Sequence, residues 1–444
     1  MAKKANNNYF SLVNSQPDFV AMERELLIYW EKLGIVKKYL KKNEKSKKRF
    51  SFLDGPITAN NPMGVHHAWG RTYKDLWQRY KNMQGFAGRF RNGFDCQGLW
   101  VEVEVEKELG LKSKRDIENI VKGNSKASIA KFIELCRQRV LKFSKTQTEQ
   151  SKRLAYFMDW DNSYYTMSNE NNYLIWHFLA KCNELGLIYK GLDTVPWCPR
   201  CGTAISQHEI LTEEYQETTH TAVTVKYPIV GRDGEFLLVW TTTPWTLPSN
   251  VSIAVNPELT YSRVRVNGEI YYIARDRIIP VLGSNVEVLE EMAGDRLLNI
   301  EYKGPFDLLP AVDGVRKVNP RNFHRTIDGK ELVTNEEGTG LVHIAPSCGH
   351  EDFLLGKENN LSLIHIIDEQ ANFLEGFGEL SGKKASEPVP IIKYLNDNGY
   401  LLAQEQYKHR YPLCWRCRSE LFFRAVDEWY IRMDPVRDKI ANVA

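Results

Sequence analysis

Two Cys-x-x-Cys pairs constrain this chain more than any other feature of its sequence. Cys198 and Cys201 lie in PWCPRCG, and Cys414 and Cys417 lie in PLCWRCRS, a domain-sized stretch further along. Each Cys-x-x-Cys turn supplies two thiolates on one tight bend, and zinc binds four such ligands in a tetrahedron. The spacing therefore predicts an inserted segment whose entry and exit strands are held together by one site of four cysteines.

Two other interpretations of the cysteines stay open at this point. Each pair is also compatible with a half-site that another ligand, such as His208 or His409, completes. The pairs are also compatible with reduced cysteines that bind nothing, because a single Cys-x-x-Cys is common. The matching aromatic and proline flanks of the two pairs favour metal. The eight cysteines of this long chain suit a reducing compartment better than a disulfide framework.

The bulk composition is that of a soluble globular protein. The 444 residues are 43% hydrophobic and 26% charged, which predicts two or three domains, each with a core. No run of 18 uncharged apolar residues occurs, and the first ten residues carry no apolar signal segment, so we expect a cytoplasmic protein. The net charge of +3 does not by itself indicate nucleic acid. The basic run at 37–49 favours a solvated linker over a patch that faces phosphate.

The first part of the chain has the pattern of a nucleotide-binding α/β sheet. A helix is predicted at 18–36 with Asp18 as its N-cap, and a buried strand at 50–53 that ends in Asp54-Gly55-Pro56. A loop at 57–64 and a helix through Trp69 and Tyr80 follow, and strand, glycine-containing loop and helix open such a sheet. Residues 101–105 alternate like a strand, but the Glu, Lys and Leu that follow favour a helix start.

The rest of the chain is predicted to hold two more helices and then a strand-rich region. Helices are predicted at 126–157 and 168–187, the second capped by Ser168, and the texture from 190 to 425 is that of short strands and turns.

His66 and His67 stand where the predicted loop meets the next helix. A helix N-terminus offers free N–H groups and a positive dipole, and imidazole can donate to phosphoryl oxygens, so this position suits polyphosphate. A pair of histidines is more often simply exposed at a surface. Its place after FLDGP and before Lys74-Asp75 favours the phosphate interpretation.

The chain resembles class I aminoacyl-tRNA synthetases, and among them the isoleucyl-tRNA synthetases, over essentially its whole length. The segments that carry the resemblance have counterparts there in the same order: FLDGP, NNPMGVHHAWGRTYKDLWQRYKNMQG, GFDCQGLWVEVEVEKELG, MDWDNSYYTMS, PWCPRCGTAIS, VWTTTPWTLPSN, GTGLVHIAPSCGHED and YPLCWRCRSELFFRAVDEWYIRMD.

One departure concerns the ATP signature. The family pattern is His-x-Gly-His, whereas this chain has Gly64-Val-His66-His67. Aligned on Lys74-Asp75, the second family histidine falls on His67 and the first on Gly64. The resemblance implies contact of His67 with the ATP phosphates, with His66 as an offset substitute.

The resemblance also implies an amino-acid pocket. Asp95 stands where the family has an aspartate that pairs with the substrate ammonium, and a carboxylate at the end of a strand suits a cation. A turn-forming aspartate before glycine is the plainer alternative. Gln97 takes the place of the usual histidine. Gly55, Pro56 and Gly98 match the pocket floor and the glycine after the motif.

A threonine-rich segment at 241–250 carries the second implied site. Taken alone it predicts the end of a β-strand with cross-strand threonine pairs. The resemblance instead implies the editing site that surrounds the terminal adenosine of mischarged tRNA, with an aspartate that holds the ammonium. Its residues are Thr241, Thr242, Thr243, Thr246, Asn250, His343 and Asp352. One methylene is worth about 1–3 kcal/mol in an apolar pocket, and isoleucyl-tRNA synthetases are the standard example of this limit on discrimination against valine.

We therefore predict an α/β fold: the N-terminal half of a Rossmann-like catalytic domain with an inserted β-rich editing domain on a zinc-ribbon base. The predicted parts are a helix and basic linker (1–48), the catalytic half (49–188), ribbon segments (189–215 and 406–425), the editing domain (216–405) and the return to the catalytic domain (426–444).

The implied activity is ligation of isoleucine to tRNA(Ile), with hydrolysis of Val-tRNA(Ile). This activity uses ATP as a substrate and requires Mg²⁺ and Zn²⁺. We expect the full-length protein to be a monomer. No Lys-Met-Ser-Lys-Ser string occurs, so we expect the N-terminal part of a longer enzyme. A valyl-tRNA synthetase, a free-standing deacylase of mischarged tRNA and a zinc-stabilised RNA-binding module are the alternatives.

Overall fold

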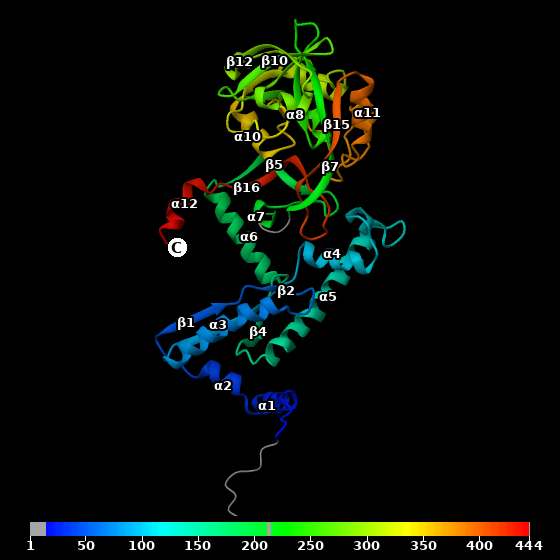
Figure 1. Cartoon of the computed structure of the whole chain (residues 1–444). Helices are drawn as coiled ribbons and strands as arrows, with labels where there is room; N and C mark the ends of the chain where they lie inside the picture. Colours follow the sequence, from blue (N-terminus) through cyan, green and yellow to red (C-terminus); the bar gives the residue numbers. More distant parts are fainter. Residues whose placement is uncertain (1–14, 211–214, 444) are drawn as a thin grey trace, which may run out of the picture. The chain divides into compact units, whose positions relative to one another are not determined.

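The computed structural model describes residues 15–210 and 215–443 (Figure 1). The chain divides into two compact units, Met1–Lys181 and Cys182–Ala444. This division is coarser than the one predicted from the sequence. Within the described ranges, every helix is too short or too polar to cross a membrane.

The first unit is built on a parallel sheet. Strand β3 pairs in parallel with three others, with Phe52 opposite Phe90 and Thr58 opposite Asp95. The strands are β1 (Arg49–Leu53), β2 (Ile57–Thr58), β3 (Ala87–Asp95) and β4 (Asp159–Tyr165). The strand predicted after the basic linker is therefore confirmed as β1, but the predicted burial is wrong, because its residues are half-buried or exposed. Strand β4 was not predicted. The carboxyl ends of these strands share one edge, which is where ligands bind in open parallel sheets.

Two helices pack against this sheet: α3 against β1 and β3, and α2 against β3. The helices of this unit are α1 (Phe19–Leu33), α2 (Ile35–Lys41), α3 (Val65–Met83), α4 (Leu99–Glu108), α5 (Ser125–Arg153) and α6 (Asn169–Glu184). Both predicted caps are confirmed: Asp18 accepts the Ala21 N–H, and the Ser168 hydroxyl accepts the Asn171 N–H. The helical interpretation of 101–105 is confirmed as part of α4. Helix α5 stops before Ala155, which has a left-handed φ of 60°.

The second unit contains a six-stranded sheet and two three-stranded sheets. Their strand orders are β12-β10-β11-β8-β7-β15, β13-β9-β14 and β16-β5-β6. The strands are β5 (Ile188–Cys198), β6 (Thr203–Ala204), β7 (Tyr215–Pro228), β8 (Glu235–Thr241), β9 (Ser252–Val255), β10 (Thr260–Val266), β11 (Glu269–Ala274), β12 (Glu287–Ala293), β13 (Arg325–Asp328), β14 (Val342–Ile344), β15 (Leu401–Pro412) and β16 (Phe422–Ile431).

The strand-rich texture predicted for 190–425 is right in kind, but helices are interspersed. These are α7 (Gln207–Ile210), α8 (Ile278–Leu282), α9 (Pro310–Val318), α10 (His350–Glu358) and α11 (Val389–Asp397), with α12 (Asp434–Ala441) beyond them. One apolar core runs through the unit and includes Val223, Trp245, Ile253 and Phe422.

The predicted strand at 241–250 is wrong for most of its length. Strand β8 ends at Thr241, and Pro244–Ser249 forms a 3-10 helix. Pro244 and Pro248 explain the change, because proline lacks the N–H that a central strand must donate. Thr246 therefore lies on a turn of helix packed into the core, whereas Thr241 ends β8 and the half-buried Thr242 and Thr243 lie between the two elements.

Candidate functional site

The loop at 57–64 leads to His66 and His67 at the N-terminus of α3, and is called the histidine loop below. Gly64 is the N-cap, and its N–H donates to Nδ1 of His67 at 3.1 Å. Because Nδ1 accepts, the neutral ring carries its proton on Nε2, where it can donate to a ligand. Burial, and then the neighbouring His66 and Arg71, lower the pKa of His67, so the ring is neutral at neutral pH. His66 is exposed, with its ring centroid 3.9 Å from that of His67.

Asp95 lies at the carboxyl end of β3. Its carboxylate accepts a hydrogen bond from the Thr58 hydroxyl at 3.0 Å and a longer one from Thr166 at 3.4 Å. Sequence reasoning missed both threonines, although each directly follows or ends a strand of the same sheet. The arrangement leaves a partly exposed anion at the sheet edge, where it can pair with a cationic group.

The other predicted pocket residues lie in turns near that edge. Gly55 and Pro56 follow β1 and are exposed, and Gln97 is exposed after β3. Gly98 is the N-cap of α4 with φ of 94°, a conformation that favours glycine.

In the second unit, Thr246 and His343 are brought together in the core. Thr246 Oγ1 lies 2.9 Å from His343 Nε2, and the same hydroxyl donates to the Thr243 carbonyl at 2.9 Å. The Thr241 and Thr243 hydroxyls are 3.2 Å apart. Burial lowers the pKa of His343 to about 4, and its Nδ1 is buried without a hydrogen-bond partner among the described residues. His343 is therefore a neutral imidazole that orients Thr246.

Asp352 lies in the first turn of α10. Its carboxylate accepts the Ala345 N–H at 2.9 Å, which ties it to the segment that follows β14. Burial raises the pKa of Asp352 to about 6. Among the described residues, the threonines make no hydrogen bond to this carboxylate. Asn250 is turned into the core, where its side chain bonds Tyr302 and the Ser252 carbonyl.

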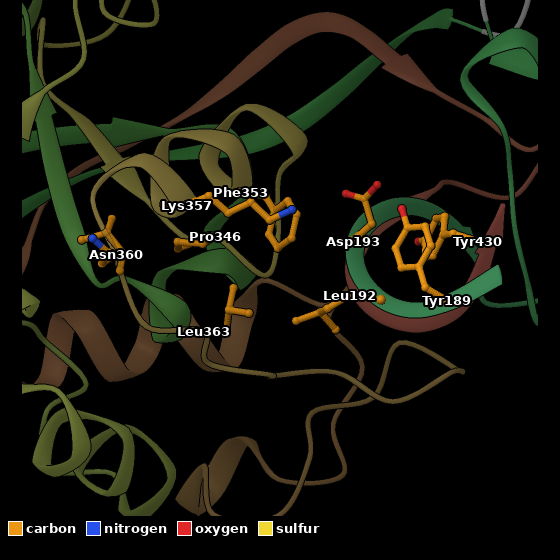
Figure 2. A pocket seen from close by; sticks show the side chains of 12 residues that line it. Tyr189, Leu192, Asp193, Pro346, Phe353, Lys357, Asn360, Leu363 and Tyr430 are labelled. Atoms are coloured by element: carbon orange, nitrogen blue, oxygen red, sulfur yellow. The ribbon is translucent and has the colours of Figure 1, made fainter. Parts of the chain in front are cut away.

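Two cavities lie near these residues. A cavity of about 670 Å³ lies between β5, β16 and α10, and Figure 2 shows Tyr189, Asp193 and Tyr430 facing Phe353 and Lys357 across it. None of the predicted site residues lines it. A cavity of about 50 Å³ is lined by Thr242 and Thr243, and also by His220, Thr221, Pro244, Trp245, Ala385, Ser386, Pro388, Tyr411, Glu420 and Phe422. Its size and the hydroxyl, imidazole and carboxylate groups in its lining suit water.

The four cysteines converge. The sulfur atoms of Cys198, Cys201, Cys414 and Cys417 all lie within 4.8 Å of one another, and the Cys198 and Cys417 sulfurs are 3.5 Å apart. Four thiolates about 2.3 Å from a zinc ion would lie about 3.8 Å apart, so the cluster is close to the size that zinc needs.

The convergence favours one shared site over two half-sites. His409 instead bonds His220 at 2.9 Å. The side chain of His208 lies outside the described residues.

Comparisons with known proteins agree on one family. Residues 25–444 match the family described as tRNA synthetases class I (I, L, M and V). The chain is 36% identical over 434 residues to an isoleucine–tRNA ligase of Sulfolobus acidocaldarius, covering 96% of this chain and 40% of that protein. A Clostridium acetobutylicum isoleucine–tRNA ligase is 37% identical over 434 residues, covering 98% and 40%. The chain thus spans about 40% of the length of the curated relatives it matches.

Proposed function

Because the chain belongs to the class I tRNA synthetases of the I, L, M and V group, we propose that it provides the isoleucine-activating and editing sites of an isoleucine–tRNA ligase. The observation that carries this proposal is that β2 and β3 pair in parallel at their ends, with Asp95 ending β3 and His67 on the helix that follows β2. The names of the relatives favour isoleucine over valine.

In the activation step the isoleucine carboxylate attacks the α-phosphorus of ATP, and pyrophosphate leaves with the bonding electron pair. The His67 Nε2–H and the N-terminus of α3 donate to phosphate oxygens, while Asp95 pairs with the isoleucine ammonium. The protein contributes mainly positioning and charge stabilisation. Mg²⁺ would accompany ATP as its counter-ion.

In the editing step a water molecule hydrolyses the ester of valine on tRNA(Ile), releasing valine and free tRNA. The Thr241–Thr246 segment would contact the terminal adenosine, and Asp352 would pair with the ammonium of the misattached amino acid. A neutral His343 supports this role, because it holds Thr246 through a bond that does not depend on charge near neutral pH.

A Cys₄ zinc site would hold the base of the second unit together. The two knuckles are alike: the Gly202 N–H donates to the Cys198 carbonyl at 2.8 Å, and the Arg418 N–H donates to the Cys414 carbonyl at 2.7 Å. A closed site of four thiolates is structural rather than catalytic. We also propose a cytoplasmic protein that acts as a monomer.

The test is ATP–pyrophosphate exchange by the complete gene product with isoleucine, valine and leucine. Exchange that is fastest with isoleucine supports the proposal. No exchange with isoleucine, measured alongside efficient hydrolysis of Val-tRNA(Ile), would instead favour the free-standing deacylase. That alternative is favoured by one observation: the buried Thr246–His343 pair lies in a unit with its own core.

A further inference from the structure

Arg71 is a buried cation at the centre of the first unit. The residue is 1% exposed, and so is its partner Asp54 at the end of β1. Its Nε donates to Asp54 Oδ2 at 3.0 Å, Nη2 to Asn92 Oδ1 at 2.7 Å and Nη1 to the Ser151 hydroxyl at 2.6 Å. Lys74 supplies a second cation to Asp54 at 2.6 Å. One guanidinium therefore joins α3, the end of β1, β3 and α5.

The Asp54 turn is also held from β4. The Tyr164 hydroxyl donates to the Asp54 carbonyl at 2.7 Å, and its ring crosses β3 at Gly93. A Cβ at Gly93 would lie 2.1 Å from that ring, so glycine is required there. The turn after β1 is thus tied to β3 through Arg71 and Asn92, and to β4 through Tyr164.

The histidine loop is held by the same face of α5. Gln150 accepts the Met63 N–H at 2.7 Å, and Gln147 donates to the Thr58 and Asn61 carbonyls at 3.0 and 2.8 Å. Ser151, the Arg71 partner, is the next residue after Gln150 on this helix. Arg71 and the loop are therefore tied to one segment of α5.

This arrangement is costly if stability alone is its purpose. Burying a guanidinium and a carboxylate removes both from water, and apolar residues of similar size often do as well or better. The fork of the guanidinium, however, fixes three acceptors in direction as well as distance. Arg71 is too buried to reach a ligand, so its effect must pass through the residues it holds.

We propose that Arg71 is a positioning residue: its guanidinium locks the start of α3 and the histidine loop to the sheet edge that carries Asp95. The consequence for catalysis rests on the proposed function. The effect on the order of the histidine loop does not depend on the proposed function, because it follows from the hydrogen bonds alone.

The first measurement is amide hydrogen exchange of the 444-residue chain by mass spectrometry, in the parent and in Arg71→Lys and Arg71→Met. Arg79→Met is the matched control, because Arg79 lies two turns along α3 and pairs with Asp75 instead. We expect exchange in peptides covering 57–67 to rise at least tenfold in both Arg71 variants and to stay unchanged in Arg79→Met. Unchanged protection of 57–67 in Arg71→Met would overturn the proposal.

The second measurement separates positioning from simple loss of stability. Asp54→Asn combined with Arg71→Met removes both buried charges, so it should unfold at a higher urea concentration than Arg71→Met alone. In the complete gene product, the kcat for ATP–pyrophosphate exchange should be about 100-fold below that of the parent in both variants. Small displacements of reacting groups lower a rate by about this factor. Recovery of kcat together with stability would show a merely structural role. An inactive parent would refute the proposed function but leave the hydrogen-exchange result to decide this inference.

Discussion

The two candidate sites are built in opposite ways. In the first unit, His66 is exposed, and on the outer face of α3 Trp69 is 64% and Trp77 52% exposed. Little apolar packing surrounds the histidine loop, and polar side chains from other elements hold it instead. In the second unit, Thr246 and His343 are 5% and 7% exposed and are placed by core packing and strand register. The first site should therefore be sensitive to single polar contacts, and the second to the integrity of its core.

The largest effect is expected at the base of the second unit. Cys414→Ser should abolish zinc binding at the proposed site, because a shared tetrahedral site needs all four thiolates, and structural zinc contributes on the order of 10 kcal/mol. Metal analysis of the purified chain checks this, with Cys136→Ser in α5 as the control that keeps its zinc. Full zinc occupancy in Cys414→Ser would rule out a shared site.

A smaller effect is expected from the partly exposed carboxylate of the first site. Asp95→Asn should raise the KM for isoleucine in pyrophosphate exchange roughly 10- to 100-fold, the value of a charge-assisted hydrogen bond. Asp161→Asn is the control, since the Asp161 side chain forms an exposed ion pair with Lys37, away from the Asp95 hydrogen bonds. An unchanged KM in Asp95→Asn would remove Asp95 from the amino-acid pocket.

The buried site should be visible in the pH dependence of stability. The pKa of His343 is lowered from 6.5 to about 4, so the unfolded chain binds more protons there and His343 destabilises the fold as the pH falls through this range. The pKa of Asp352 is raised from 3.8 to about 6, so Asp352 stabilises the fold over nearly the same range as the pH falls. The two contributions oppose each other.

Separate substitutions should expose each contribution. As the pH falls from 6.5 to 4, the free energy of unfolding of Asp352→Asn should drop by about 3 kcal/mol relative to that of the parent. The free energy of unfolding of His343→Gln should rise by about as much relative to the parent. Urea unfolding across that range measures both. Parallel stability curves for the parent and the two variants would show that neither group is titrated as proposed.

The smallest effects come from two glycines with opposite requirements. Gly70 lies in the middle of α3 with open space where a Cβ would be, so Gly70→Ala should stabilise the first unit by about 0.5–1 kcal/mol. Gly202 has φ of 60° in the first cysteine knuckle, so Gly202→Ala should destabilise the second unit by about 1 kcal/mol. Thermal unfolding of the two variants should shift in opposite directions, and shifts of equal sign would contradict this assignment.

Sequence patterns predicted the sheet start, most helices of the first unit and two helix caps because these depend on local periodicity and local hydrogen bonds. They did not predict α2 or the helices of the second unit. They missed β4, whose polar residues Asp159–Tyr165 alternate weakly, and they extended a strand over Pro244 and Pro248. The sequence indicated the cysteines and histidines through spacing. It could not indicate Arg71, Thr58 or Thr166, because their partners are distant in sequence and meet only in the folded sheet.

The most direct test of two separate sites is Asp352→Ala in the complete gene product, assayed both for exchange with isoleucine and for hydrolysis of Val-tRNA(Ile). Loss of the ammonium contact should slow hydrolysis roughly 10- to 100-fold, while exchange should match the parent because Asp95 and His67 lie in the other unit. Unchanged hydrolysis, or an equal loss of both activities, would contradict the account.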